Sequence, residues 1–288
     1  MSVVPTAVYH PQIVEDVLVG EREGLDIVGI QDHPYQRRFL DTFALIANLQ
    51  ARTQRIRFFP DVANLPLRGA TMIAKAATSL DVMSNGRFEL GIGAGSFWEA
   101  VAGMGGPRRT PKQAVSALEE AIPIIRAALD VGPERRVVRS TGAHYPVPGY
   151  PPGPPPAHRV EIWVGAYRPR GLRLIGRLGD GWVPSLGYMG VNAFREASAR
   201  LDEATQAAGR EPGSVRRIYN IGGAITDGPM GDGPLDGPPD RWVETLTPWV
   251  LDLGVDAFIY WPSTPEELHR YATEIVPAVR ANLRSAAS

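Results

Sequence analysis

A charged pair beside an apolar stretch offers the first chemistry in this sequence. Asp32 and His33 come just after the apolar run Ile27–Ile30, within IVGIQDHPY. An imidazole in such a place can pass a proton near neutral pH or donate a hydrogen bond to a carbonyl of a bound molecule. It can equally be a loop histidine that is hydrogen-bonded to the backbone, and the pair alone leaves both interpretations open. We take His33 as a candidate acid–base group and Asp32 as the carboxylate that would orient it.

Three glycines at alternate positions in Gly91–Gly95 form a second candidate segment. They do not match the dinucleotide fingerprint G-x-G-x-x-G, because the third glycine comes one residue early and no helix opens directly behind it. Glycines at such a place let a flat ring or a phosphate approach the backbone closely. A bulge or a tight turn explains them equally well.

A third candidate segment is Tyr167–Arg170, which opens a predicted helix with Pro169 in its first turn. The amide groups of a helix N-terminus, together with Arg168 and Arg170, can bind an anion. The same two arginines can instead be solvated surface residues.

Composition argues against several other classes of protein. The chain has no Cys, which excludes disulfides, thiolate catalysis and iron–sulfur clusters. Its five His fall in neither HxH nor HExxH spacing, and no G-x-S-x-G occurs, so we expect neither a metal site nor a serine nucleophile elbow. With 30 Lys+Arg against 31 Asp+Glu, we expect no nucleic acid partner and no membrane attraction. The apolar runs are too short for a membrane span and the start of the chain lacks a secretory signal, so we expect a cytoplasmic protein.

The candidate segments need a fold that brings them to one place. Short β-type runs alternate with amphipathic helical patterns, which is typical of βα units around a parallel sheet. The predicted strands are Val3–Val8, Ile27–Ile30, Ile56–Asp61, Phe88–Ile92, Glu161–Gly165, Gly181–Pro184, Val215–Ala224 and Ala257–Trp261. The predicted helices are Gln12–Glu23, Asp41–Arg52, Ala70–Met83, Pro111–Leu129, Pro169–Leu178, Asn192–Ala208, Asp240–Leu253 and Pro265–Asn282. This α/β pattern favours a (β/α)8 TIM barrel, and a doubly wound open sheet is the alternative.

In such a barrel the segments after the strands meet at the C-terminal rim, where active sites are built. We therefore expect residues 1–288 to form one barrel domain with its site at that rim. Two segments interrupt the alternation. One is a Pro-rich insertion at 131–159, in which Pro146–Pro156 is predicted to be polyproline-like. The other is a Gly/Pro-rich loop at 226–240, which is either a solvated linker or a lid over the rim.

Several segments resemble the bacterial luciferase-like family of flavin- and deazaflavin-dependent oxidoreductases. They are GLDIVGIQDH at 24–33, LPLR at 65–68, AKAATSLDVMSNGRFELGI at 74–92, GAG at 93–95, IWVG at 162–165 and LGDGW at 178–182, in the family's order and spacing. The last hundred residues fit only by element pattern. The resemblance implies a (β/α)8 barrel with the cofactor ring at its rim, backed by a nonprolyl cis peptide near Asp61-Val62.

The resemblance also implies roles for individual residues. Asp32 and His33 match the pair that faces the ring and the substrate in the deazaflavin branch. Three further segments would contact the cofactor. The ring would be backed by Asp61, Val62, Ala63 and Asn64, and beside it would lie Gly93, Ala94, Gly95 and Ser96. The cofactor phosphate would be held by Ala166, Tyr167 and Arg168.

The chain departs from the family at two of these places. Small residues usually stand where Ala166–Arg168 are, so either Arg168 reaches the phosphate or its bulk closes the pocket. Ser96 stands where the sugar-phosphate dehydrogenases of the deazaflavin branch carry a catalytic Glu, which argues against a sugar phosphate as substrate. Three tryptophans predicted near strand ends either wall the substrate pocket or belong to the core: Trp98, Trp182 and Trp261.

The Asp–His pair favours coenzyme F420 as cofactor, and so does a composition typical of a G+C-rich genome, with 31 Gly and 27 Pro. The expected activity is hydride transfer between the deazaflavin and a small, mostly apolar substrate. The alternatives are an FMN-dependent two-component monooxygenase, a non-catalytic flavin-binding member of the family and, from another class, a metal-dependent barrel hydrolase. We also expect a homodimer and a partner reductase that supplies reduced flavin or F420.

Overall fold

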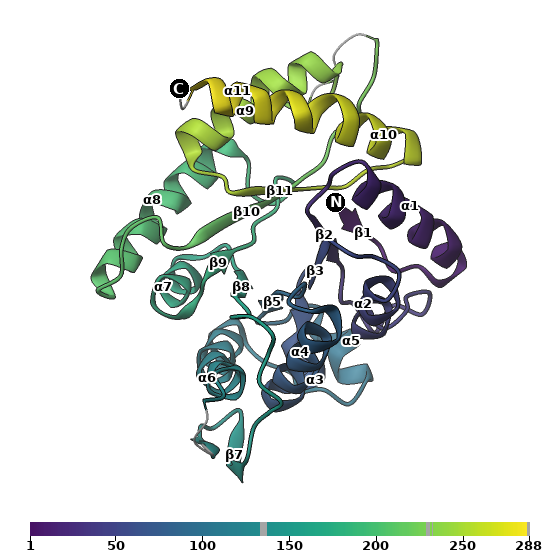
Figure 1. The fold of residues 1–288 in the computed structure, drawn as a ribbon. Coiled ribbons are helices and arrows are strands. Elements are labelled where there is room, and N and C mark those ends of the chain that lie inside the picture. The colour runs from purple at the N-terminus through teal and green to yellow at the C-terminus, as the bar shows by residue number, and fades with distance from the viewer. Residues whose placement is uncertain (133–136, 229–230, 232, 287–288) are drawn as a thin grey trace.

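The computed structural model describes residues 1–132, 137–228, 231 and 233–286. Strands and helices alternate along the chain, with the parallel strands at the centre and most helices outside them (Figure 1). The central strands are β1 (Ser2–Val3), β2 (Ile27–Ile30), β3 (Arg57–Pro60), β4 (Ala63–Asn64), β5 (Leu90–Gly93), β8 (Ile162–Gly165), β9 (Gly181–Trp182), β10 (Arg216–Ile221) and β11 (Ala257–Tyr260).

Parallel pairing joins these strands into two sheets that share one axis. The first has the order β1-β2-β3, and the second has the order β11-β10-β9-β8-β5-β4. A bridge between Phe58 and Phe88 connects β3 to the segment that enters β5. Because β4 continues β3 beyond residues 61 and 62, the strands follow one another in chain order around the axis, as the predicted barrel requires.

The helices that return the chain between strands form the outer layer (Figure 1). They are α1 (His10–Arg22), α2 (Thr42–Gln50), α4 (Ala70–Ser84), α6 (Pro111–Leu129), α7 (Pro169–Leu178), α8 (Val191–Ala207), α9 (Pro239–Leu253) and α10 (Pro265–Arg270). Two short helices, α3 (Leu65–Arg68) and α5 (Trp98–Gly103), follow strand ends. The predicted caps are present, since Asp41 accepts from the amide of Ala44 and Thr264 accepts from that of Glu267.

Two predicted elements differ from the structure. The first strand was expected to reach Val8 but ends at Val3, because Pro5 cannot donate to a ladder and Ala7–Tyr9 turns into a 3₁₀ helix. The helix expected over Pro265–Asn282 is interrupted by a π-helical turn, η2 (Tyr271–Ile275), before α11 (Val276–Ala286). The wider turn places Tyr271, Ala272 and Ile275 in the core together.

Inward and outward side chains alternate along the strands and separate two cores. The lumen holds Phe59, Trp163, Val183, Ile218 and Ile259. At β9, an added Cβ on Gly181 would meet the ring of Trp163, so Gly181 faces inward and Trp182 faces the helices. Trp182 is fully buried, stacks on Phe194 at 5.0 Å and donates to the carbonyl of Ala166 at 2.8 Å. Trp182 is therefore core and does not wall a substrate pocket.

The insertion at 131–159 joins α6 to β8. It contains an antiparallel hairpin of β6 (Val138–Thr141) and β7 (Pro146–Tyr150), so the run predicted as polyproline-like begins as a strand. Pro is tolerated in such an edge strand because one side of it needs no amide donor. Glu120 of α6 accepts from the amides of His144 (2.8 Å) and Tyr145 (3.2 Å) at the hairpin turn. Residues 133–136 of this insertion lie outside the described residues.

The loop at 226–240 follows β10 at the carboxyl end of the barrel. Its described residues are fixed by an ion pair of Asp227 with Arg270 of α10 (2.7 Å) and by a bridge between Ile225 and Gly237. A role as a lid stays a prediction, and residues 229, 230 and 232 lie outside the described residues.

Arg87, in the turn before β5, connects three segments. Its guanidinium donates to the carbonyls of Gln50 at the end of α2 (2.9 Å), Thr53 (3.1 Å) and Ile56 (2.9 Å) in the next turn, and Ser84 at the end of α4 (3.0 Å). Carbonyl groups that have no partner within their own helix, at the ends of α2 and α4, thus share Arg87 as a hydrogen-bond donor. Within the described ranges, no helix combines the length and apolar character needed to cross a membrane.

Candidate active site

The predicted site residues follow β2, β3, β5 and β8, at the carboxyl rim of the barrel. Contacts between these segments bring most of them together. Among the described residues, no group of three His, Asp or Glu side chains is gathered in a way that could hold a metal ion.

Asp32 anchors the loop after β2. It is 2% exposed, and its carboxylate accepts from Arg68 Nε (2.8 Å), Arg68 Nη2 (2.7 Å) and the amide of Asn64 (2.8 Å). Arg68 also binds Asp41 at 2.7 Å and lies over the ring of Phe43. Bidentate pairing of this kind fixes geometry as well as charge. Asp32 therefore holds the loop to β4 and α3, and the expected orientation of His33 through Asp32 is replaced by a different contact.

That contact comes from Tyr35, whose Oη lies 2.7 Å from His33 Nδ1. Burial lowers the pKa of His33, and burial together with the charge of Asp32 raises the pKa of Tyr35 to about 12. Near neutral pH the imidazole is thus uncharged and the phenol is protonated. The hydrogen bond between the two groups holds the imidazole in place, and its direction follows the tautomer of the ring. Nε2 has no hydrogen-bond partner among the described residues, and the rings of His33 and Phe97 meet edge to face with 5.8 Å between their centres.

The segment after β3 forms a bulge over the centre of the barrel. The peptide bond between Asp61 and Val62 is cis, as the family resemblance implied. A Cβ on Gly93 would lie 2.8 Å from Val62 Cγ2, and one on Gly165 would lie 3.2 Å from it. The glycines after β5 and β8 thus make room for the side chain of Val62. Val62 links three of the predicted segments in one apolar floor.

The glycine run after β5 has a local packing role. Gly95 adopts φ +94°, and a Cβ there would meet Pro66 and Trp98. Phe97 also takes a left-handed conformation, at φ +53°, which is uncommon for a bulky side chain and holds its ring outward with 62% exposure. Trp98 is half-buried at the start of α5. The rim thus carries exposed aromatic surface beside His33.

The predicted phosphate-binding segment has separate roles for its residues. The carbonyl of Ala166 is used by Trp182. Tyr167 is 37% exposed and contacts Tyr188 at 5.8 Å between ring centres. Arg168 is exposed at the N-cap of α7, where it could meet an anion. Arg170 instead reaches back to α6, with hydrogen bonds to the carbonyl of Lys112 and the hydroxyl of Ser116.

Sequence reasoning missed four residues of this region. Tyr35 contacts His33, and Arg68 contacts Asp32. In the sequence, each could have been found as a polar side chain next to a predicted site segment. Asn220 is buried on β10 and lies 3.3 Å from Asp61 Oδ1. In the sequence, Asn220 could have been found as the single amide side chain within the apolar run IYNIGGA. Ser185, after β9, binds the hydroxyl of Tyr167.

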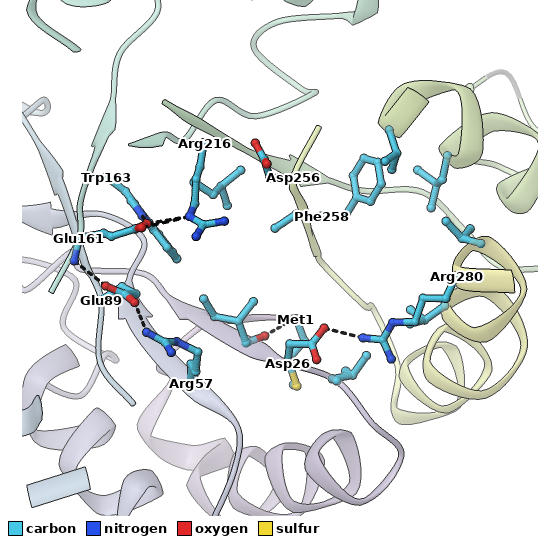
Figure 2. Close-up of a pocket in the computed structure, with 18 of the residues that line it drawn as sticks. Met1, Asp26, Arg57, Glu89, Glu161, Trp163, Arg216, Asp256, Phe258 and Arg280 are labelled. Carbon is cyan, nitrogen blue, oxygen red and sulfur yellow. Dashed lines mark hydrogen bonds and ion pairs between the residues drawn. The ribbon is translucent and has the colours of Figure 1, made fainter. Parts of the chain in front are cut away.

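A cavity of about 580 Å³ lies at the opposite, amino-terminal end of the barrel (Figure 2). Inward side chains from the strand starts form ion pairs there, between Arg57 and Glu89 and between Arg216 and Glu161 (2.9 Å). Phe258 and residues of η2 and α11 form an apolar outer wall. Charges that already neutralise one another at this end of a barrel indicate a structural role. We therefore place the candidate active site at the rim.

Residues 6–229 match the sequence profile of luciferase-like monooxygenases. The chain belongs to the luciferase-like monooxygenase family. The matched range includes every predicted site residue, together with Tyr35, Arg68 and Asn220.

Curated relatives of this luciferase-like protein are longer than it is. An F420-dependent glucose-6-phosphate dehydrogenase of Gordonia bronchialis is 28% identical over 218 residues, which cover 73% of this chain and 63% of that protein. The luciferase-like chain thus spans less than two thirds of that relative's length. Among solved structures, the coenzyme F420-dependent tetrahydromethanopterin reductase of Methanopyrus kandleri has a TM-score of 0.79 at 16% identity, covering 96% of this chain and 97% of that one. An EDTA monooxygenase of Chelativorans has a TM-score of 0.81 at 15% identity, covering 98% and 93%. These likenesses confirm the luciferase-like (β/α)8 barrel over the doubly wound alternative.

Proposed function

We propose that this luciferase-like protein is a coenzyme F420-dependent oxidoreductase that moves a hydride between the deazaflavin and a small, mostly apolar organic substrate. The observation that carries the proposal is an uncharged His33, held through Nδ1 by Tyr35, beside the apolar floor of Val62. F420-dependent enzymes among the curated relatives support the choice of cofactor.

The rim fits a flat cofactor with an anionic tail. Val62 would lie against one face of the ring, in the space that Gly93 and Gly165 leave for it. Arg168 and the amide groups at the start of α7 would hold the phosphate. Bound there, a deazaflavin would supply hydride transfer, and the protein would supply orientation and proton handling.

His33 would move the proton. In the direction of substrate oxidation, the uncharged Nε2 would accept the proton of a substrate hydroxyl, and the imidazolium so formed would return that proton to the oxygen in the direction of reduction. Tyr35 Oη would accept from Nδ1–H, which leaves Nε2 free to take the proton, and the rings of Tyr35 and Phe97 would exclude water from one side of the imidazole. The ion pair of Asp32 with Arg68 holds the loop that carries His33 and Tyr35. Ser96 is exposed and offers no carboxylate, so a sugar phosphate is not the expected substrate.

An FMN-dependent monooxygenase is the second candidate function. It is supported by the likeness of the fold to the EDTA monooxygenase, which is as great as the likeness to the F420-dependent reductase. The bulky segment Ala166–Arg168 supports a third candidate, a non-catalytic flavin-binding member of the family. A reductase that supplies reduced cofactor and a homodimeric assembly belong to the proposal as expectations.

A titration with two cofactors separates these candidates. Trp98 and Trp261 are half-buried near the rim, so a cofactor bound there is expected to quench their fluorescence. Oxidised F420 and FMN are titrated in parallel, and the reduced form of the tighter ligand is then tested for turnover. Micromolar binding of F420 alone supports the main proposal, whereas preference for FMN supports the monooxygenase. Binding of a cofactor without turnover of any substrate tried favours the non-catalytic candidate, and no binding of either cofactor contradicts the main proposal.

A further inference from the structure

A strip of cations runs outward from the rim where α6 and α7 lie side by side (Figure 1). Arg170 joins the two helices, because its guanidinium donates to the carbonyl of Lys112 (3.0 Å) and to the hydroxyl of Ser116 (2.9 Å). We call the four cations along this contact the basic strip; they are Lys112 in the first turn of α6 and Arg170, Arg173 and Arg177 on α7.

The positions of these residues along each helix put their side chains on one shared face. On a helix surface, residues three and four apart are neighbours. Arg173 comes three residues after Arg170 and four before Arg177, and both of those arginines contact Glu119 of α6. Arg173 therefore lies between them, on the side of α7 that faces α6. On α6, Lys112 lies about two turns before Glu119, so it faces α7 in the same way.

The two helices supply a single acid to this face. Glu119 pairs with Arg177 and with Arg170, whose Nη2 lies 3.4 Å from Glu119 Oε2. The sequence of α7 contains no Asp or Glu. Glu120, the other acid of α6, accepts instead from backbone amides at the turn of the hairpin. One carboxylate thus answers two arginines and leaves the other two cations of the strip unbalanced.

Those two cations have no partner in the protein. Lys112 and Arg173 are exposed, and neither side chain forms a hydrogen bond or an ion pair with any residue that the structure describes. Like charges at these spacings repel one another. The first turns of α6 and α7 also hold no acid, although the positive end of a helix dipole favours an acid over a cation there. Folding gains nothing from these cations, whereas an anion bound along the strip would stabilise them.

The strip begins where the proposed function places the cofactor phosphate. Arg168 is the N-cap of α7, two residues before Arg170, and lies at the carboxyl rim. Coenzyme F420 continues beyond its phosphate as a chain of γ-linked glutamates, which carries a row of carboxylates away from the ring. Between Arg168 and Arg177 the helix rises by roughly 13 Å, a length that several such glutamates can follow. FMN ends at its phosphate and has no group that would reach the strip.

We infer that Lys112 and Arg173 bind carboxylates of the glutamate tail and thereby favour a long-tailed F420 over a cofactor that ends at its phosphate. The inference rests on the proposed function for the place of the ring and the phosphate. Arg170 and Arg177 already pair with Glu119 and add little. Exposed ion pairs are individually weak and are screened by salt, so the preference for the tail is modest and falls with ionic strength.

Cofactors that differ only in their tail test the inference. Dissociation constants are measured for F420 with a long glutamate tail and for F420 trimmed back to its lactyl phosphate, at about 50 mM and about 500 mM salt. Wild type is compared with the double variant Lys112→Ala/Arg173→Ala and with the charge-conserving Lys112→Arg/Arg173→Lys. The matched control is Arg22→Ala/Arg52→Ala, which removes two exposed cations after α1 and α2, away from the strip.

At low salt we expect wild type to bind the long-tailed form about threefold to tenfold more tightly than the trimmed form, the range for two exposed ion pairs. The double alanine variant should lose this preference and still bind the trimmed form as wild type does. The charge-conserving variant and the control should keep the preference, and high salt should abolish it in wild type. If wild type binds the two forms equally, or the double alanine variant keeps the full preference, the inference is overturned while the proposed function stands.

A second measurement covers the case in which neither form of F420 binds, which contradicts the proposed function. A short γ-linked glutamate peptide, which is the tail without ring or phosphate, is titrated into isotope-labelled wild type at low salt and followed by NMR. Chemical-shift changes at Lys112 and Arg173 that are lost in high salt support a polycarboxylate site at the strip. The absence of such changes at millimolar peptide overturns the inference independently of the ring.

Discussion

The two ends of the barrel differ in how the polar groups nearest the lumen are partnered. At the amino-terminal end, Arg57 pairs with Glu89 and Arg216 pairs with Glu161. At the carboxyl rim, His33 is uncharged with Tyr35 as its hydrogen-bond partner, and Asp61 accepts from the neutral side chain of Asn220. Paired charges stabilise one arrangement and gain nothing from a ligand. Single polar groups that are partly removed from water gain a partner when a ligand binds, which supports the proposal that the rim is the functional end.

The largest expected effect tests the rim. Replacing His33 with Ala should lower turnover by about 100-fold to 10,000-fold, the range for loss of a general acid, while cofactor affinity changes by less than about threefold. Single-turnover rates and cofactor titrations measure the two quantities separately. His10→Ala, a change on α1 whose ring bonds to Asn48, is the matched control and should leave both unchanged. Equal losses of turnover and affinity in His33→Ala would remove its catalytic role.

The next effect tests the amino-terminal end. Glu89 accepts from Arg57 and from the amide of Glu161 (2.7 Å), and its Oε1 lies 3.1 Å from His158 Nε2. Glu89→Ala leaves these donors without an acceptor and should lower the unfolding free energy by about 2–3 kcal/mol, since solvent around Arg57 offsets part of the loss. Urea denaturation measures the change. Cofactor affinity should stay within twofold of wild type. A large loss of affinity at unchanged stability would show that the amino-terminal end binds the cofactor and is not merely structural.

A pair of arginines at the start of α7 sharpens the comparison within the rim. Arg168→Ala should weaken binding of F420 about tenfold, because a charged donor to the phosphate is lost at an exposed position. Arg170→Ala removes contacts with Lys112 and Ser116 on α6 and should leave affinity unchanged. Equilibrium titration measures the F420 affinity of both variants. Similar affinities for the two would show that Arg168 does not bind the phosphate.

The smallest effect concerns a tautomer. In the proposed tautomer, Tyr35→Phe removes the acceptor for His33 Nδ1–H, a hydrogen bond that is stronger when the imidazole is charged. The pKa of His33 should therefore fall further, and the part of the pH–rate profile that depends on it should move to lower pH, with about a threefold change in rate at neutral pH. NMR titration of the His33 ring measures the pKa directly. Tyr188→Phe, on an exposed side chain, is the control; an unchanged His33 pKa in Tyr35→Phe would show that Tyr35 has no such role.

Periodicity predicted most of the barrel because each βα unit buries its own apolar stripe. It failed where a strand is only two residues long, since alternation within Gly181–Trp182 is too short to show which side faces the lumen. The rim segments could be predicted from strand ends and family motifs. Their partners could not, because Arg68 reaches Asp32 across 36 residues and Asn220 reaches Asp61 across 159. Such pairs depend on how the barrel closes and leave no local pattern.

Arg87 has a consequence for how the chain opens. One guanidinium holds carbonyls from the end of α2, the turn before β3 and the end of α4. When any one of these segments unfolds, it loses its hydrogen bond to Arg87, and the guanidinium then holds the other two segments less firmly. In native-state hydrogen exchange, the second and third βα units should therefore lose protection as one cooperative block. The loop that carries His33 starts from that block, so opening of the block would also release the proposed proton-transfer residue at the rim.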